Sequence, residues 1–192
     1  MLFLSIGGWI AIIVVVLIIV ILLALVANVY NKMVKGRNRC KDAFSQIDVQ
    51  LTRRFDLIPN LVETVKGYAK HEESILEEFA KARGAYQASN GDIDKVSEAN
   101  NALTSVLTRF MAVSEQYPEL KADAHFTSMM ATLKETEDKI AITRQFYNDS
   151  ALKYKDLVQM FPSNIIAKLF NFKPAPFFEA SEADRAVPQV KF

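Results

Sequence analysis

The sequence predicts an all-α protein with an N-terminal transmembrane helix. An antiparallel bundle of long helices should follow, then a short C-terminal helix and an extended tail. Two observations predict this fold. The first 31 residues carry no charged side chain. After them, apolar residues recur at alternating spacings of three and four, as on the contact faces of helical bundles and coiled coils. We call these contact faces seams.

Residues 7–29 form the predicted transmembrane helix. Residues 10–27 are an unbroken apolar run, and a membrane-spanning helix needs about 20 such residues. Trp9 and Tyr30 flank the run, at the level where amphipathic rings prefer to lie. A cleaved signal peptide is the alternative, but it would have a basic residue before the run and a small-residue cleavage site.

Charge predicts the orientation, because basic residues stay on the cytoplasmic side of a membrane. No basic residue precedes the apolar run, and five follow it by residue 41: Lys32, Lys35, Arg37, Arg39 and Lys41. We therefore expect residues 1–6 to form a short extracytoplasmic N-terminus and the bundle to be cytoplasmic. Trp9, Tyr30, Lys32, Lys35 and Arg37 are the predicted membrane-interface anchors.

The remaining composition limits the partners. The net charge is +1 with acidic and basic residues interspersed, which excludes the one-sided basic face of a nucleic-acid-binding protein. Cys40 is the single cysteine, so no internal disulfide forms and a reducing compartment is favoured. Because Cys40 lies close to the membrane, palmitoylation is an alternative to an inert thiol.

Residues 30–162 form the predicted bundle domain. Its helices are expected at residues 31–87, 93–117 and 121–161, with seams that begin at Ile47, Val96 and Phe126. Asp92 is a plausible N-cap for the second helix. Pro118 ends the second helix and Pro162 ends the third, since the residue before a proline disfavours helical angles.

Pro59 lies inside the first seam, whose phase passes through it unchanged. We therefore expect one long helix that is kinked near Pro59, with a break at Pro59 as the alternative.

Residues 163–192 form a short helix and a tail that contains Phe and Pro. Ser163 and Asn164 are the expected caps of a helix over residues 165–170, and residues 173–176 should be extended. The tail phenylalanines are expected to cap the open bundle. Alternatively, residues 165–170 lie in the membrane interface or dock into a partner.

Helix lengths predict self-association. Residues 31–87 would span about 85 Å and residues 93–117 about 37 Å, so the membrane-proximal half of the first helix lacks a sequence-adjacent partner. Its apolar residues are the candidate interface with a second subunit: Phe44, Ile47, Leu51 and Phe55. The alternative is that the tail folds back over them.

Four polar residues interrupt the seams: Arg54, Glu72, Glu137 and Arg144. Unpaired buried charges are costly, so these residues should pair or lie at a wet edge. They are predicted to form a polar network. It either sets the register of the helices as ordinary salt bridges or marks a groove that binds a partner.

Several motifs resemble the bacterial LemA family. They are Arg37-Asn38 after the apolar helix, QIDVQLTRRFDLIPNLVETVKGYAKHE at 46–72, YPELKA at 117–122, TEDKI at 136–140, RQFYN at 144–148 and FPSN at 161–164. Phe44 departs from the family pattern, where tryptophan is expected. The resemblance implies an antiparallel bundle behind a membrane anchor in the bacterial inner membrane. It supplies no catalytic residues. It also implies relatives involved in magnetosome membrane formation and gene neighbourhoods with membrane metalloproteases.

No catalytic, cofactor-binding or metal-ligating residues are predicted. His71 has Gly67 and Ile75 four residues to either side, whereas zinc on a helix needs a second ligand there. Neither histidine has an obvious nucleophile with an orienting carboxylate.

We therefore expect a non-enzymatic scaffold of the bacterial envelope that is anchored in the membrane, associates with itself and binds another membrane protein. An accessory or regulatory subunit of a membrane protease is the alternative, and an enzyme is the third hypothesis.

Overall fold

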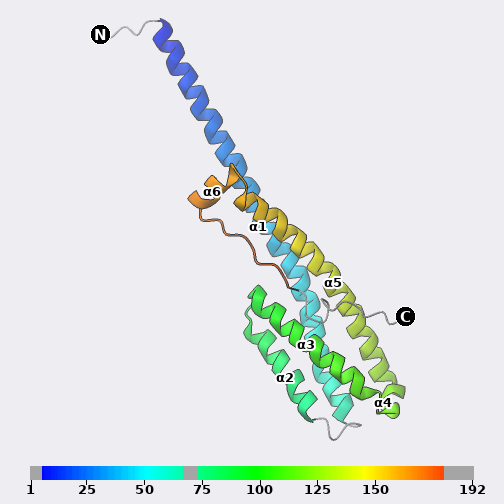
Figure 1. Ribbon diagram of the computed structural model, residues 1–192. Coiled ribbons are helices and arrows are strands. Elements are labelled where there is room, and N and C mark those ends of the chain that lie inside the picture. Colours follow the sequence, from blue (N-terminus) through cyan, green and yellow to red (C-terminus); the bar gives the residue numbers. More distant parts are fainter. Residues whose placement is uncertain (1–5, 67–72, 180–192) are drawn as a thin grey trace, which may run out of the picture. The chain divides into compact units, whose positions relative to one another are not determined.

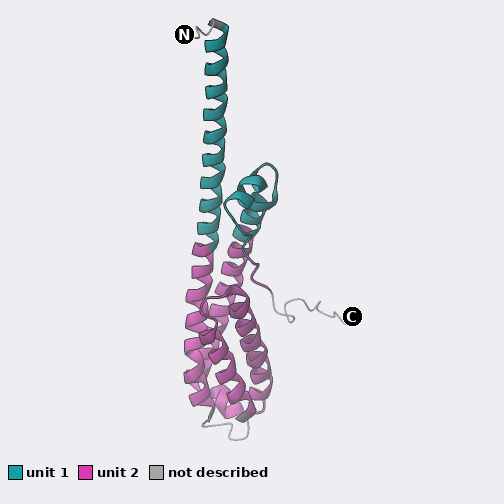
Figure 2. Ribbon diagram, turned by 90° about the vertical axis from the view of Figure 1, so that its left-hand side faces the viewer, with its two compact units in different colours: residues 1–40, 150–175 teal, residues 41–149, 176–192 magenta. Residues whose placement is uncertain are grey.

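The computed structural model describes residues 6–66 and 73–179, and every regular element within them is a helix. The helices are α1 (Ile6–Lys66), α2 (Glu73–Ala88), α3 (Ile93–Ser114), α4 (Pro118–Ala122), α5 (Ala124–Gln159) and α6 (Ser163–Leu169) (Figure 1). Two compact units are coloured separately in Figure 2. Unit 1 contains Met1–Cys40 and Ser150–Ala175, and unit 2 contains Lys41–Asp149 and Pro176–Phe192. The predicted all-α fold is confirmed.

Unit 1 begins with the apolar part of α1, whose large side chains are exposed from Trp9 onward. Among the described residues, α1 is the one helix long and apolar enough to cross a membrane, and none of its most apolar stretch is buried in the protein. Such a surface is unfavourable in water and favourable in lipid. It is therefore a candidate membrane span.

The rest of unit 1 packs α1 against the end of α5. Met33 and Cys40 of α1 and Tyr154 of α5 are buried. A Cβ atom at Gly36 would lie only 3.0 Å from Tyr154 Cδ2 and 3.4 Å from Leu157 Cδ1. The missing side chain at Gly36 therefore allows the two helices to approach closely.

Unit 2 is a helical bundle built from α2, α3, α4 and the adjoining segments of α1 and α5. The apolar seam residues form its core, including Ile47, Leu51, Ile58, Leu61, Val65, Val96, Leu103, Phe126, Leu133, Ile140 and Tyr147. Phe110 of α3 lies edge-on to Phe79 of α2 and to Phe126 of α5, with ring centroids 5.7 and 6.0 Å away. The predicted spacing thus identifies which helix faces are buried.

The predicted single helix over residues 31–87 is wrong. α1 ends at Lys66 and α2 begins at Glu73, and residues 67–72 lie outside the described part of the chain. Thr52 Oγ1 lies 2.8 Å from the hydroxyl oxygen of Tyr86, whereas 34 residues of continuous helix would separate them by about 50 Å. The two helices therefore lie side by side in opposite directions. Their seams remain in phase because both helices face one core, and apolar spacing carries no direction.

A break at Pro59 is also wrong, because α1 is helical on both sides of this residue. Asp92 is confirmed as the N-cap of α3, since its side chain accepts a hydrogen bond from Lys95 N at 3.1 Å. The predicted ends of the later helices are shifted. α3 ends at Ser114, and Pro118 begins the separate helix α4 rather than only ending a helix.

The third predicted helix, residues 121–161, is observed as α5 over Ala124–Gln159. The carboxylate of Asp123 accepts hydrogen bonds from the backbone N–H groups of His125 and Phe126 at 2.8 and 2.9 Å. Such bonds satisfy the first N–H groups of a helix, which explains its later start. Ser163 is the first residue of α6 rather than a cap, and its hydroxyl donates to Met160 O.

The candidate interface between copies is corrected by the structure. Ile47, Leu51 and Phe55 are at most 1% exposed within the single chain, and Phe44 is half-buried with its ring 5.9 Å from that of Tyr147. The physical reason is the length of α5. Its 36 residues provide the cover that the shorter α3 cannot, so these side chains do not need a second subunit.

The tail also returns to unit 2. Phe178 is 1% exposed, and its backbone N–H and C=O both bond the side-chain amide of Asn148, at 2.8 and 3.0 Å. The hydroxyl of Tyr147 donates to Pro176 O at 2.6 Å, and that of Ser97 donates to Glu179 O at 3.2 Å. Residues 176–179 therefore pack on the bundle. Of the tail phenylalanines expected to cap it, Phe178 is buried there, whereas Phe161, Phe170 and Phe177 are exposed.

Candidate functional site

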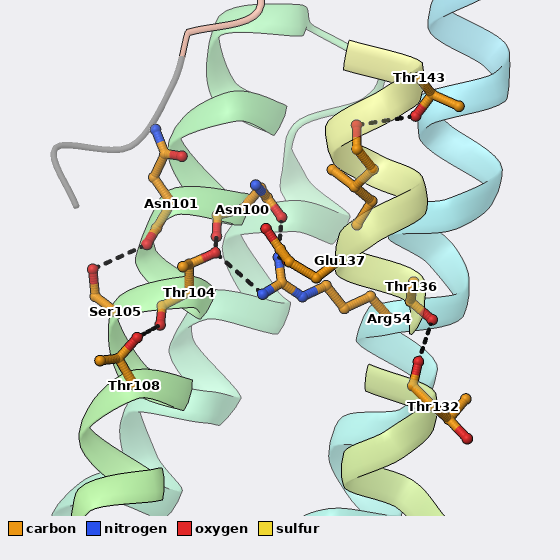
Figure 3. A network of polar contacts seen from close by, with 11 residues as sticks. Arg54, Asn100, Asn101, Thr104, Ser105, Thr108, Thr132, Thr136, Glu137 and Thr143 are labelled. Atoms are coloured by element: carbon orange, nitrogen blue, oxygen red, sulfur yellow. Dashed lines mark hydrogen bonds and ion pairs between the residues drawn. The ribbon is translucent and has the colours of Figure 1, made fainter. Parts of the chain in front are cut away.

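A buried arginine cluster joins α1, α3 and α5 in unit 2 (Figure 3). Arg54 is 3% exposed, and its Nη1 lies 2.7 Å from Glu137 Oε2. Nη1 also donates to Asn100 Oδ1 at 2.5 Å, and Nη2 donates to Thr104 Oγ1 at 3.1 Å. A buried charge is tolerated only when it is paired and hydrogen-bonded. The guanidinium of Arg54 meets both conditions.

Only part of the predicted polar network is brought together. Arg54 and Glu137 pair, Arg144 is half-buried two turns further along α5, and Glu72 lies outside the described residues. Asn100 was missed by the sequence reasoning, as was Thr104. The available signal was the Asn-Asn pair in the middle of a predicted helix, where asparagine is a poor helix former unless it has a role.

Tyr86 of α2 contacts α1 through its hydroxyl and its ring. Its hydroxyl donates to Asp48 Oδ1 at 2.8 Å and lies 2.8 Å from Thr52 Oγ1, and its ring stacks on Phe55 with centroids 4.3 Å apart. Burial raises the pKa of Tyr86 to about 12, with a further rise from the neighbouring Asp48 carboxylate. The phenol therefore remains a neutral hydrogen-bond donor throughout the physiological range.

Aromatic contacts hold the residues that follow α6 next to the C-terminal end of the apolar run. The Tyr30 ring lies edge-on to Phe170 and Phe172, with centroids 4.9 and 5.5 Å away. The guanidinium carbon of Arg37 is 5.4 Å from the Phe172 ring centroid, within range of a cation–π interaction. α6 is therefore held beside Tyr30, directly after the candidate membrane span.

Beside this contact, unit 1 exposes an apolar patch, which we define as Met160, Phe161, Ile165, Leu169 and Phe170. Their exposed fractions run from 48% for Phe170 to 80% for Phe161. Ile165 and Leu169 are four residues apart and so share a face of α6. Exposed apolar clusters of this kind mark contacts with lipid or with another protein.

The predicted membrane anchors are all at the surface of unit 1. Trp9 is 58% exposed, Tyr30 is 37% exposed, and Lys32, Lys35 and Arg37 are exposed as well. Their exposure is compatible with contact with headgroups. Their anchoring role stays a prediction.

The described residues contain no group of three or more His, Cys, Asp or Glu side chains that could hold a metal ion. Glu63, His125 and Ser128 share an open depression of about 550 Å³. All three are exposed, and no hydrogen bond joins their side chains in the described part of the chain. A serine hydrolase needs its nucleophile and base linked in this way, so the depression lacks that arrangement.

Comparison with known proteins gives a family and several relatives. The family model described as LemA family matches residues 43–192. Protein LemA of Metamycoplasma hominis is 27% identical over 157 residues, which cover 81% of this chain and 71% of that protein. Magnetosome protein MamQ 2 of Paramagnetospirillum magneticum is 28% identical over 179 residues, which cover 80% of this chain and 66% of that protein.

Magnetosome protein MamQ of Magnetospirillum gryphiswaldense is 25% identical over 189 residues, which cover 84% of this chain and 70% of that protein. The chain thus spans about two thirds of the length of each of these relatives, and slightly less for MamQ 2. The match to the family model begins after the apolar run, so the candidate membrane span rests on the sequence and structure of this chain.

Proposed function

Because this chain belongs to the LemA family, we propose that it is a membrane-anchored scaffold that performs no chemistry of its own. It presents a helical bundle at the cytoplasmic face of a bacterial inner membrane. The observation that carries the proposal is α1. One end of this helix exposes an apolar run long enough to cross a bilayer, and the other end supplies core residues of the bundle.

The relatives support a structural role. Two of those compared are named as magnetosome proteins, and none of the three is named for a reaction. The interior of unit 2 supports it as well, because its buried arginine is neutralised within the chain. Chemistry at a protein site typically needs titratable groups that converge on an accessible cavity.

Orientation follows from the five basic residues after the apolar run, which should remain cytoplasmic. In this orientation the apolar patch lies at the level of Tyr30 on the cytoplasmic side. We propose that α6 rests in the lipid interface with Ile165 and Leu169 among the acyl chains, as amphipathic interfacial helices do.

Self-association remains part of the proposal, but its location changes. The seam of α1 is covered by the chain itself. A second copy or another membrane protein would therefore meet the protein through the membrane span or the apolar patch, where apolar side chains remain exposed.

Membrane fractionation with site-specific crosslinking tests the proposal. The full chain should stay in the membrane pellet after salt and alkaline washes. Val15→Lys/Ile19→Lys should release it, because each charge at mid-membrane costs about 3 kcal/mol. The matched control Val49→Lys/Ile142→Lys replaces exposed apolar residues of unit 2 and should leave the protein in the pellet. Release of the unaltered chain would contradict the anchor.

Crosslinkers at Ile165 and Leu169 then identify the neighbour. Lipid adducts, or adducts to a second copy or to a membrane protein that is not a protease, support the proposed scaffold. Adducts to a membrane protease, with loss of that protease's activity when the chain is deleted, would favour the accessory-subunit alternative. A cytoplasmic reporter fused to the C-terminus should be active, and an inactive one would overturn the proposed orientation.

A further inference from the structure

Unit 1 contains a partly enclosed cavity of about 290 Å³ between α1 and the end of α5. This volume is near the lower end of small-ligand pockets, which begin at about 300 Å³. Four basic side chains line the cavity and no acidic one does: Lys32, Lys35, Arg39 and Lys153. We call it the basic cavity.

The basic side chains converge from two helices. Lys32, Lys35 and Arg39 follow one another at intervals of three and four residues, which places them on one face of α1. Lys153 approaches from α5, and Gly36 allows the two helices to lie close together. Segments that are more than 100 residues apart in the sequence therefore build a single basic site.

None of the four cations forms an ion pair in the described part of the chain, and all four are exposed at the rim of the cavity. Like charges held close together repel one another. No acidic side chain lines the cavity, so a bound anion would be needed to relieve this repulsion.

Tyr154 forms part of the cavity wall between the basic side chains. It lines the cavity and is 2% exposed. Its hydroxyl is enclosed in the protein and has no hydrogen-bond partner among the described residues. The basic side chains therefore supply the charge of the cavity.

The cavity is at the depth of lipid headgroups. Lys32 follows directly on the apolar run, and Arg39 is about 12 Å further along α1 than Asn31. The headgroup layer on each side of a bilayer is about 5–8 Å thick. A lipid phosphate would therefore lie at the level of Lys32 and Lys35.

We propose that the basic cavity binds a phosphate group, either the headgroup phosphate of an anionic lipid or free inorganic phosphate. Lys35, Arg39 and Lys153 neutralise its charge. This site goes beyond the proposed scaffold role. A phosphate-binding cavity could exist whether or not the bundle recruits partners.

The test uses the full chain in a non-ionic detergent, where no charged membrane surface contributes. Native mass spectrometry follows titration with phosphatidylglycerol or with zwitterionic phosphatidylcholine, and phosphorus NMR follows inorganic phosphate. Lys35→Gln/Lys153→Gln should weaken binding roughly 30-fold, at about fivefold for each basic residue.

The matched control is Lys168→Gln/Lys173→Gln, which removes two exposed charges from unit 1 outside the cavity. It should change binding by less than about twofold. Binding of phosphatidylglycerol alone identifies a lipid headgroup as the ligand, and binding of inorganic phosphate with the same dependence on the variants identifies a free anion.

Three results would overturn the proposal: equal losses in the cavity and control variants, equal binding of both lipids by every variant, or no binding of either phosphate source. Circular dichroism and the labelling rate of the buried Cys40 check that each variant retains the fold of unit 1.

Discussion

Charged side chains lie between α1 and α5 in both units, yet they are treated differently. In unit 2, Arg54 is buried and meets Glu137, Asn100 and Thr104 inside the chain. In unit 1, four cations surround the basic cavity, and no acidic residue lines it. The buried charge of Arg54 is therefore neutralised by a residue of the same chain. The cations around the basic cavity have no such residue in the cavity lining, so their neutralisation depends on what surrounds the protein.

The same contrast holds for apolar surface. Among the described residues, five phenylalanines of unit 2 are buried, namely Phe55, Phe79, Phe110, Phe126 and Phe178, whereas Phe146 and Phe177 are exposed. Unit 1 exposes the membrane span and the apolar patch. Unit 2 has a buried core, as expected of a folded bundle that is presented to partners. Unit 1 has exposed apolar and basic groups, which suit contact with lipid. Three predictions test this contrast, beginning with the largest expected effect.

Glu137→Leu should destabilise unit 2 by about 3 kcal/mol, because it leaves the guanidinium of Arg54 buried without its counter-ion. Arg54→Leu should cost less, about 2 kcal/mol, since the Glu137 side chain is 37% exposed and can turn to water. Urea unfolding of the full chain in detergent, followed by far-ultraviolet circular dichroism, measures both.

Asp138→Leu is the control for this pair, because it removes a neighbouring exposed carboxylate from α5. Its expected effect is below about 0.5 kcal/mol. If Glu137→Leu were as stable as the unaltered protein but changed its assembly state, the cluster would serve partner choice instead of setting the register of the helices.

Gly36→Leu should loosen unit 1 by about 2 kcal/mol, because its side chain would overlap Tyr154 and Leu157. Cys40 is 4% exposed and burial raises its pKa, so maleimide should label it slowly in the unaltered protein. The variant should label roughly 10- to 30-fold faster. Gly84→Leu is the matched control, since a Cβ there meets nothing within 4 Å. Equal labelling rates in the two variants would refute the close packing inferred here.

Tyr86→Phe should lower the stability of unit 2 by about 1 kcal/mol at neutral pH through loss of the hydrogen bond to Asp48. The pKa of Tyr86 is raised to about 12 in the folded protein, while that of the unfolded phenol is about 10. The contribution of Tyr86 is therefore fully present below about pH 10 and is lost as the pH rises toward 12.

Urea midpoints for the unaltered protein and the variant, measured between pH 8 and 11, should converge by about 1 kcal/mol at the upper end, after allowance for partial solvent exposure. The remaining ionisable groups are the same in both proteins, so their contributions cancel in the difference. A constant gap across this range would show that the Tyr86 pKa is not raised.

The comparison also explains where sequence reasoning succeeded. Val65 and Leu103 were assigned to seams, and both are buried, because the 3.6-residue period of a helix is a local property that sequence records directly. Asp92 was assigned as an N-cap for the same local reason. In the candidate site, the sequence predicted a polar network that contains Arg54 and Glu137. It did not indicate that these two residues pair with each other or that other side chains bind the guanidinium.

Sequence reasoning failed where distance along the chain mattered. It joined α1 and α2 into one helix, and it left Ile47 and Leu51 without cover. It also gave no reason to place Lys153 beside Lys35, although both residues were visible. Each of these errors concerns which pairs of helices pack against each other.

The sequence by itself determined that the chain is helical, that its first apolar run suits a membrane, and which face of each helix is buried. Only the tertiary structure decided that α2 lies against α1, that α5 and Phe178 complete the bundle, and that four cations line one cavity with Tyr154. The physical reason is that helical periodicity arises from neighbouring residues. The hydrophobic effect that selects their partners has no direction, so it is satisfied only when the whole chain packs together.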